Sequence, residues 1–174
     1  MAVRRKLNET IKRMYSNGIE DEKYVMEAVV NTLGGTCTKS TKEDDMFKHI
    51  DFWWDSPKKG VIGIDVKGIK KKHRKDKYVD DTIHWVEIQN VRGNKGWIYC
   101  EATYIAFRTL TQIIFVKTST LRDWSEKKVC GKELVHNNPK YCYIPYQRYQ
   151  RNDIVYKIPT NDLINLSDFI IDTD

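Results

Sequence analysis

The sequence predicts a mixed α/β fold, in which a central sheet is flanked by helices. Three observations support this. A helical period of apolar residues occupies 19–35, short β-branched and aromatic segments follow between residues 49 and 118, and helical and strand patterns return after that. The 174 residues, of which 40% are hydrophobic, are enough to bury a core. We therefore expect one domain over 1–174.

Two helices are expected at the start of the chain. Residues 7–18 read as a short polar helix that ends at Asn17-Gly18. Residues 19–35 read as an amphipathic helix with acidic residues in its first turn and Gly34-Gly35 at its end. Its apolar face has helical spacing and consists of Val25, Ala28, Val29, Thr32 and Leu33.

The remaining elements follow from short apolar runs separated by turn residues. Five runs rich in β-branched and aromatic residues predict strands, and the first two are joined by the turn-forming stretch DSPKKG. These strands are expected at 49–54, 60–68, 84–91, 103–110 and 112–118. A Ser or Thr N-cap opens a helix over 119–129, and 148–170 suggests a further strand and a short helix.

Charge and composition restrict the class of protein. Thirty Lys and Arg against 24 Asp and Glu give a net charge of +6, which favours a polyanionic partner. No apolar run approaches the roughly 20 residues that span a bilayer, and no signal peptide precedes the charged start, so a cytoplasmic location and no membrane partner are expected. The four cysteines form no CxxC pair, which favours free thiols over a zinc site.

Two expected strands contain carboxylates. Asp65 and Lys67 are two residues apart in an apolar strand and so project from the same face, and Asp51 lies in the strand before it. An uncompensated carboxylate in such a setting costs several kcal/mol, which a divalent metal would offset. The acid-x-Lys spacing occurs three times in the chain, and a structural ion pair explains these residues equally well.

The order of these residues resembles the PD-(D/E)XK nuclease superfamily, which includes restriction endonucleases and Holliday-junction resolvases. The motif runs from Glu20 through Asp51 and the triplet Asp65-Val66-Lys67 to Gln89. The likeness covers about residues 18–120 and is nearest to small phage-encoded, resolvase-like nucleases. Ile50 stands where the superfamily usually has the motif proline.

The resemblance implies a restriction-endonuclease-like core, with a C-terminal strand and helix added to it. It also implies metal-dependent endonuclease activity on DNA, in recombination, repair or processing, for a protein encoded by a phage or mobile element and present in the host cytoplasm. A homodimer is expected if both strands are cut. The alternatives are a non-catalytic nucleic-acid-binding protein of the same fold and an RNA nuclease.

The resemblance also assigns roles to residues. Asp51, Asp65 and the Val66 carbonyl would hold Mg²⁺, for which Mn²⁺ can substitute, and Lys67 would assist the attacking water. Gln89 would contact the site from the adjacent strand. Glu20 would be the helix acid that completes the metal ligands, with Glu27 as a substitute two turns along; either is otherwise an ordinary surface glutamate.

Two further segments suggest contact with nucleic acid. The tract after the Asp65 strand is expected to clamp phosphates, although a charge run is usually a solvated loop; its cations are Lys70, Lys71, Lys72, Arg74, Lys75 and Lys77. In 141–151, tyrosines interleave with arginines, which suits a nucleic-acid surface or an edge strand. Most of the five tryptophans are expected in the core.

Overall fold

The computed structural model describes residues 2–69 and 79–173, and between residues 2 and 17 it describes the backbone alone. In this part of the chain the central sheet has six strands in the order β1-β2-β3-β5-β6-β9. Their bounds are Thr36–Lys39 (β1), Phe52–Ser56 (β2), Gly60–Lys67 (β3), Tyr104–Arg108 (β5), Gln112–Lys117 (β6) and Phe169–Asp172 (β9). A second sheet, in the order β4-β8-β7, consists of Ile83–Gln89 (β4), Tyr146–Gln147 (β7) and Ile154–Pro159 (β8).

Helices complete the described elements. The α-helices are Ala2–Leu33 (α1), Thr118–Val129 (α2) and Thr160–Leu166 (α3). Asp44–Lys48 forms a π-helical turn (η1), and Trp97–Tyr99 forms a 3₁₀ turn (η2). The expected mixed α/β fold with helices around a mixed central sheet is therefore confirmed.

The sheet is mixed because one pair of neighbours in it is parallel. β3 and β5 run parallel, whereas every other pairing in the central sheet is antiparallel. Parallel neighbours need a crossover connection, and here residues 68–103 make it. That connection includes β4 and η2, so β4 leaves the central sheet and pairs with β8 instead. As a result, the strand beside β3 is β5.

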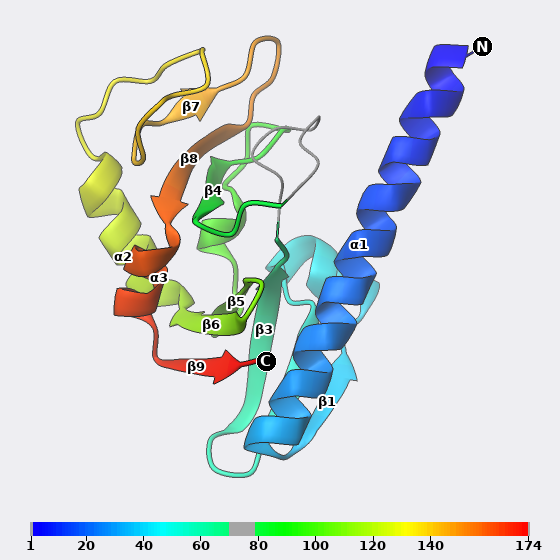
Figure 1. Cartoon of the computed structure of the whole chain (residues 1–174). Coiled ribbons are helices and arrows are strands. Elements are labelled where there is room, and N and C mark those ends of the chain that lie inside the picture. The colour runs from blue at the N-terminus through cyan, green and yellow to red at the C-terminus, as the bar shows by residue number, and fades with distance from the viewer. Residues whose placement is uncertain (1, 70–78, 174) are drawn as a thin grey trace.

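Each face of the central sheet is covered by a different set of elements. Figure 1 shows α1 on one side of β3 and β4, β8 and α2 on the other side. Val25 and Val29 of α1 are fully buried against Ile64 of β3 and its neighbours. Burying side chains of this size stabilises a fold by roughly 1.5–3 kcal/mol each. The opposite face packs Phe107 of β5 against Leu121 of α2 and residues of the second sheet.

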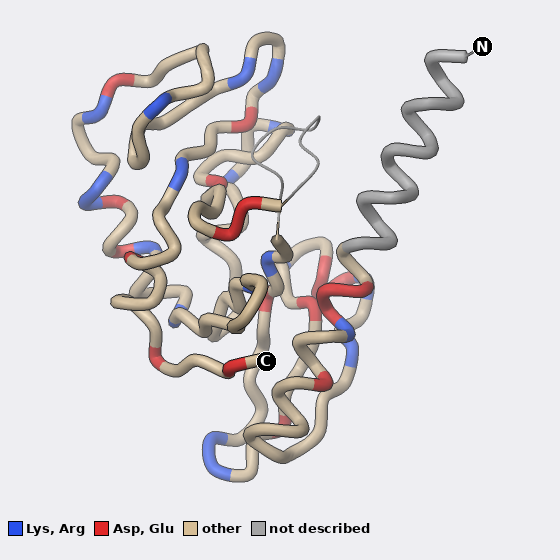
Figure 2. Tube along the Cα trace, in the orientation of Figure 1, with Lys and Arg blue, Asp and Glu red and all other residues tan. Residues whose placement is uncertain are grey.

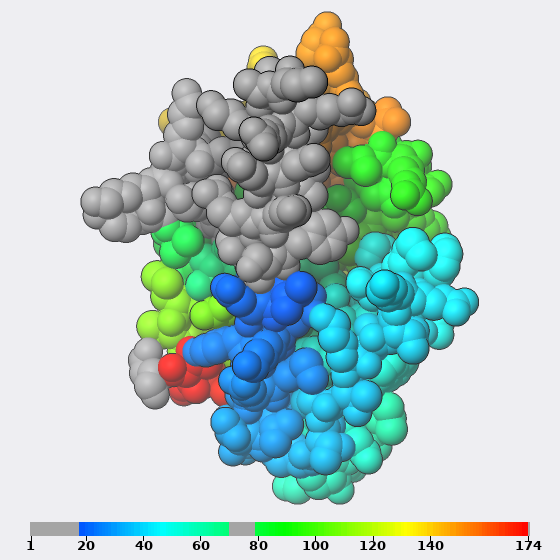
Figure 3. Space-filling view, turned by 90° about the vertical axis from the view of Figure 1, so that its right-hand side faces the viewer, coloured from blue at the N-terminus to red at the C-terminus, as the bar shows by residue number. Residues whose placement is uncertain are grey.

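The first helix differs from the expectation. Instead of one helix over 7–18 and another over 19–35, α1 continues through Gly18 without a break. A glycine inside a helix costs only about 1 kcal/mol, and helix continuation with burial of Val25 and Val29 outweighs that cost. The end is as expected, because Gly34 and Gly35 both have positive φ. Figure 3 looks onto the side of the molecule that α1 covers and shows the described turns of α1 in the middle of it, beside residues 36–60.

Two strands of the central sheet were missed by the sequence patterns. β1 is only four residues long and mostly exposed, and β9 follows α3 in a segment that lacks alternation. Both form edges of the sheet and pair with the strand next to them, β1 with β2 and β9 with β6. The C-terminal region is therefore integral to the sheet, and not only an addition to a core that ends near residue 120.

Candidate active site

The pairing of β2 with β3 brings two aspartates together. The register of β2 and β3 ends with Phe52 opposite Ile64, and Asp51 comes directly before β2. The Asp51 backbone N–H donates to the Ile64 carbonyl at 2.9 Å, and its Oδ2 accepts from the Val66 N–H at 2.6 Å. Each of the two carboxyls influences the pKa of the other, so they lie close together, and like charges at close range are destabilising. The two carboxylates therefore need a proton or a cation between them.

Lys67 supplies one positive charge to this pair. Its Nζ lies 2.7 Å from Asp65 Oδ1, and the Asp65 side chain is only 3% exposed. The ammonium also lies over the Trp97 ring of η2, 4.7 Å from its centroid. β5 offers only Ile105 and Phe107 beside these residues, so the pair is enclosed by apolar side chains on that flank.

Burial dominates the electrostatics of the two carboxyls. Burial, and then the charge of Asp65, raise the pKa of Asp51 to about 7. Burial also raises the pKa of Asp65, and Lys67 opposes that rise. Burial of the Lys67 ammonium works against its charge, yet the two aspartates outweigh it and the net pKa of Lys67 is raised. Lys67 is therefore a fixed cation, and Asp51 titrates near neutral pH.

One carboxylate oxygen in the site lacks a partner. Asp65 Oδ2 is buried, and no described group hydrogen-bonds to it. The groups that lower the pKa of Asp65 are Lys67 first and then the Asp51 side chain, and neither donates to Oδ2. With both carboxyls ionised, the oxygen has no donor, which costs about 1–3 kcal/mol or more for a charged group. A divalent cation ligated by Asp51 and Asp65 would satisfy this oxygen, so the two residues fit a metal.

Among the α1 acids considered for the metal site, Glu22 is the one whose pKa responds to Asp51, and the motif did not select it. Glu20 and Glu27 are both exposed, and Glu27 pairs with Lys23 at 3.7 Å on the surface of α1. Glu22 is 21% exposed; burial raises its pKa, the bond from Lys39 opposes the rise, and the charge of Asp51 adds to it. The motif spacing could not distinguish acids two residues apart on a continuous helix, because only packing decides which one faces the sheet.

Two residues of the segment before β2 also face the site. Asp45, in η1, raises the pKa values of both Asp51 and Asp65. Burial, followed by the charge of Lys67, lowers the pKa of His49. His49 adopts a left-handed backbone conformation, with φ of 52°, at the end of η1. Figure 2 shows acidic and basic segments close together where β3 ends beside α1. No sequence pattern pointed to Asp45, because η1 has no recognisable periodicity.

Gln89 does not occupy the position that the motif gives it. It was expected on the strand adjacent to the Asp65 strand, but β4 belongs to the second sheet and the adjacent strand is β5. Its Nε2 donates to the Asn152 carbonyl at 2.6 Å. The adjacency is therefore wrong, because the crossover carries β4 out of the central sheet.

The remaining predicted site residues are the cations after β3, from Lys70 to Lys77, and they lie outside the described residues. Within the described ranges, no three or more His, Cys, Asp or Glu side chains form a preformed metal cluster. The carboxylate pair with its unpartnered oxygen is thus the feature that fits a cation. Val66, expected to contribute its carbonyl, contributes its N–H to Asp51.

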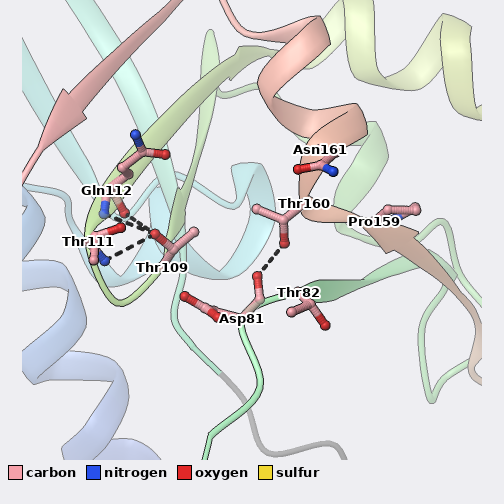
Figure 4. A pocket seen from close by; sticks show the side chains of 8 residues that line it. All are labelled: Asp81, Thr82, Thr109, Thr111, Gln112, Pro159, Thr160 and Asn161. Atoms are coloured by element: carbon pink, nitrogen blue, oxygen red, sulfur yellow. Dashed lines mark hydrogen bonds between the residues drawn. The ribbon is translucent and has the colours of Figure 1, made fainter.

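A separate polar pocket of about 280 Å³ lies where β4 begins, at the opposite end of this strand from Gln89. It lies between Asp81, Thr82, the β5–β6 turn and the β8–α3 junction, and Figure 4 shows its lining side chains. The Leu110 N–H donates to Asp81 Oδ2 at 2.9 Å, and the Thr160 hydroxyl donates to the Asp81 carbonyl. These two contacts tie Asp81 to the β5–β6 turn and to the start of α3, which is a structural role.

Comparisons of the chain with protein-family models, with curated proteins and with solved structures gave no match. No helix in the described residues combines the length and the apolar character needed to cross a bilayer. The function of the protein is therefore inferred from the geometry of the site.

Proposed function

We propose that this protein is a metal-dependent endodeoxyribonuclease that hydrolyses phosphodiester bonds in DNA. One observation carries the proposal: the Asp51 and Asp65 carboxyls lie close enough to influence each other, Lys67 pairs with Asp65, and one Asp65 oxygen is buried without a partner among the described residues. A purely structural ion pair needs one acid and one base. The second acid raises the energy of the site unless a cation is bound.

The roles follow from the contacts. Asp51 and Asp65 would hold Mg²⁺ or Mn²⁺, with Glu22 near enough to influence the same charge. The bound ion would polarise the phosphate and lower the pKa of a coordinated water. Lys67 remains charged and stabilises negative charge that develops on the phosphate, while Trp97 shields it from water. The attacking water would lose a proton to solvent as its oxygen bonds to phosphorus, and the ester oxygen whose P–O bond breaks would take up a proton and leave as a hydroxyl.

A restriction-endonuclease-like core is part of the proposal. It is supported by the order of a long helix, an antiparallel β1-β2-β3 unit and a parallel fourth neighbour, with the acid-x-Lys triplet at the end of β3. On the same resemblance we propose that the gene belongs to a phage or mobile element and that the enzyme acts in recombination, repair or DNA processing.

Cleavage assays with matched variants test the proposal. Purified protein is incubated with duplex, nicked and branched DNA in Mg²⁺, in Mn²⁺ and in EDTA, with RNA of the same sequence as a comparison. Cleavage that requires the cation and is lost in Asp65→Ala and Lys67→Ala, while DNA binding persists, supports a nuclease. Equal cutting by wild type and both variants would assign the activity to another site or to a contaminant.

The second candidate is a nucleic-acid-binding protein without catalytic activity. The observation that favours it is the closed Lys67–Asp65 ion pair, which already neutralises one carboxylate. In that case neither Mg²⁺ nor Mn²⁺ raises the melting temperature, and no substrate is cut. A rise in melting temperature with either ion, lost in Asp51→Asn, excludes this candidate.

A further inference from the structure

The basic strap is the segment that joins α2 to β8 and includes the last turn of α2 and β7, residues 127–152. It has six Lys and Arg and one Glu, a formal charge of +5, whereas the whole chain has +6. Residues 70–78 contribute another +5 by sequence, so all other residues together have a charge of −4. The basic character of the protein therefore comes from two segments, of which the strap is the described one. Its cations are Lys127, Lys128, Lys132, Lys140, Arg148 and Arg151.

Two of these cations, Lys140 and Arg151, are exposed and outside any ion pair within the described residues. Figure 2 shows the Lys and Arg segments spread along the strap, with little acidic colour among them. Arg148 pairs with the buried Asp153, and it is the one strap cation in an ion pair within the described residues. Lys140 and Arg151 can therefore neutralise phosphates without first breaking an ion pair.

Aromatic rings stand exposed among the cations. Tyr149 is 82% exposed and Tyr141 is 69% exposed. Neither lies in a strand, because β7 is limited to Tyr146–Gln147. Lys140 Nζ lies 5.5 Å from the centroid of the Tyr141 ring. Two exposed rings beside exposed cations match a chain of phosphates that also offers flat bases.

The backbone that presents these side chains is anchored. The Val135 N–H donates to the Pro145 carbonyl at 3.0 Å, and the Gln147 N–H donates to Val135 at 2.9 Å. The Tyr143 N–H donates to the Lys157 carbonyl at 2.9 Å, and the Tyr143 ring packs edge-on against Trp124. Because the strap is held to β8 and α2, binding would order side chains and leave the backbone in place.

We infer that the basic strap binds a single-stranded segment of nucleic acid, through phosphate contacts by Lys140 and Arg151 and base stacking on Tyr141 and Tyr149. Stacking requires bases that are not already paired, which a duplex does not offer along its length. The inference rests on the proposed function, since it specifies a substrate with a single-stranded part for the same enzyme. The strap contributes affinity, and the carboxylates contribute the chemistry.

Fluorescence anisotropy with a labelled 20-nucleotide oligo(dT) strand and a duplex of equal length, in EDTA over a salt series, tests the inference. Wild type should bind the single strand more tightly than the duplex. Lys140→Gln/Arg151→Gln should lower the slope of log affinity against log salt by about 1.4, from about 0.7 per phosphate contact. The charge-matched control Lys58→Gln/Lys117→Gln, at the far end of the central sheet, should leave the slope unchanged.

The tyrosines give an independent measurement. Tyr149→Leu should weaken single-strand binding about tenfold with an unchanged salt slope, whereas Tyr149→Phe, which keeps the ring, should bind like wild type. Equal binding by Leu and Phe variants, or equal slopes for the strap and control double variants, overturns the inference. Loss of binding to phosphatidylserine vesicles in the strap variants, with oligonucleotide binding intact, would instead assign the strap to anionic membranes.

The assay separates this inference from the proposed nuclease activity because it uses no divalent cation. If the strap variants bind normally and Asp65→Ala abolishes cleavage, the enzyme stands and the strap inference fails. If the strap variants lose binding and wild type cuts nothing, the strap inference stands and the proposed activity fails.

Discussion

Two buried aspartates in this protein are nearly alike in their immediate contacts. Asp65 is 2% exposed and pairs with Lys67, and Asp153 is 1% exposed and pairs with Arg148. Each has one carboxylate oxygen that is buried and has no partner among the described residues. A buried acid with one cation and an unpartnered oxygen is thus not in itself a sign of catalysis.

The difference lies in the second acid. Asp51 lies close to Asp65, and each of the two carboxyls has a raised pKa, for which burial is the first cause. The partner of Asp153 is a guanidinium whose side chain is 39% exposed and can remain hydrated. The comparison teaches that an ion pair stabilises a fold locally, whereas two neighbouring carboxylates create a need for a cation.

The largest expected difference between the two aspartates is in catalysis. Asp65→Asn should lower the cleavage rate by about 10³-fold, because it removes a metal ligand and the partner of Lys67. Asp153→Asn should cut at the rate of wild type once folded, since Asp153 lies outside the site. Single-turnover cleavage at saturating Mg²⁺ measures both, and comparable losses in the two variants would contradict the distinction.

The free energy of unfolding should change in opposite directions in the variants Asp51→Asn and Asp153→Asn. Without divalent cations at pH 8, Asp51→Asn should raise the free energy of unfolding by about 2 kcal/mol, because it removes a charge that the fold disfavours. Asp153→Asn should lower it by about 1–3 kcal/mol, because Arg148 loses its partner. Urea unfolding in EDTA measures both changes.

The stabilisation in Asp51→Asn should depend on pH in a defined way. The folded pKa of Asp51 is about 7 and its ordinary value is 3.8, so the folded state holds the proton more tightly. The penalty from this group is absent below about pH 4, grows as the pH rises and is complete above about pH 7. The wild-type and variant unfolding energies should therefore converge on acidification. A constant difference from pH 4 to pH 8 would show that Asp51 is not the group responsible.

A smaller effect should distinguish the helix acids. Glu22→Gln should weaken Mn²⁺ binding about tenfold, as loss of a group near the ligands typically does. Glu20→Gln should change it less than about twofold, because Glu20 is exposed on α1. Isothermal titration calorimetry at pH 8 measures both affinities. The reverse order would restore Glu20 as the helix acid that the motif selected.

The smallest effect is expected for Gln89. Gln89→Ala should leave Mn²⁺ affinity unchanged and reduce the free energy of unfolding by about 1 kcal/mol, through loss of the bond to the Asn152 carbonyl. Calorimetric titration and urea unfolding check the two parts. A clear loss of metal affinity would place Gln89 nearer the carboxylates than its hydrogen bond indicates.

The sequence by itself determined the α/β class, six strands of the two sheets and the projection of Asp65 and Lys67 from the same face of their strand. These features depend on local periodicity, because a period of two fixes which side chains of a strand share a face. The pairing of the Asp51 and Asp65 strands followed from the short turn between them. Neither the shared face nor the strand pairing depends on distant parts of the chain.

Only the tertiary structure decided which acid of α1 approaches the site, where β4 lies and that Asp45 is near the carboxylates. Each depends on packing between segments far apart in sequence. Neighbouring helix positions have almost the same local pattern, and a strand pattern does not specify the sheet that the strand joins. The physical reason is that burial and pairing partners are properties of the assembled core, which no local stretch of sequence contains.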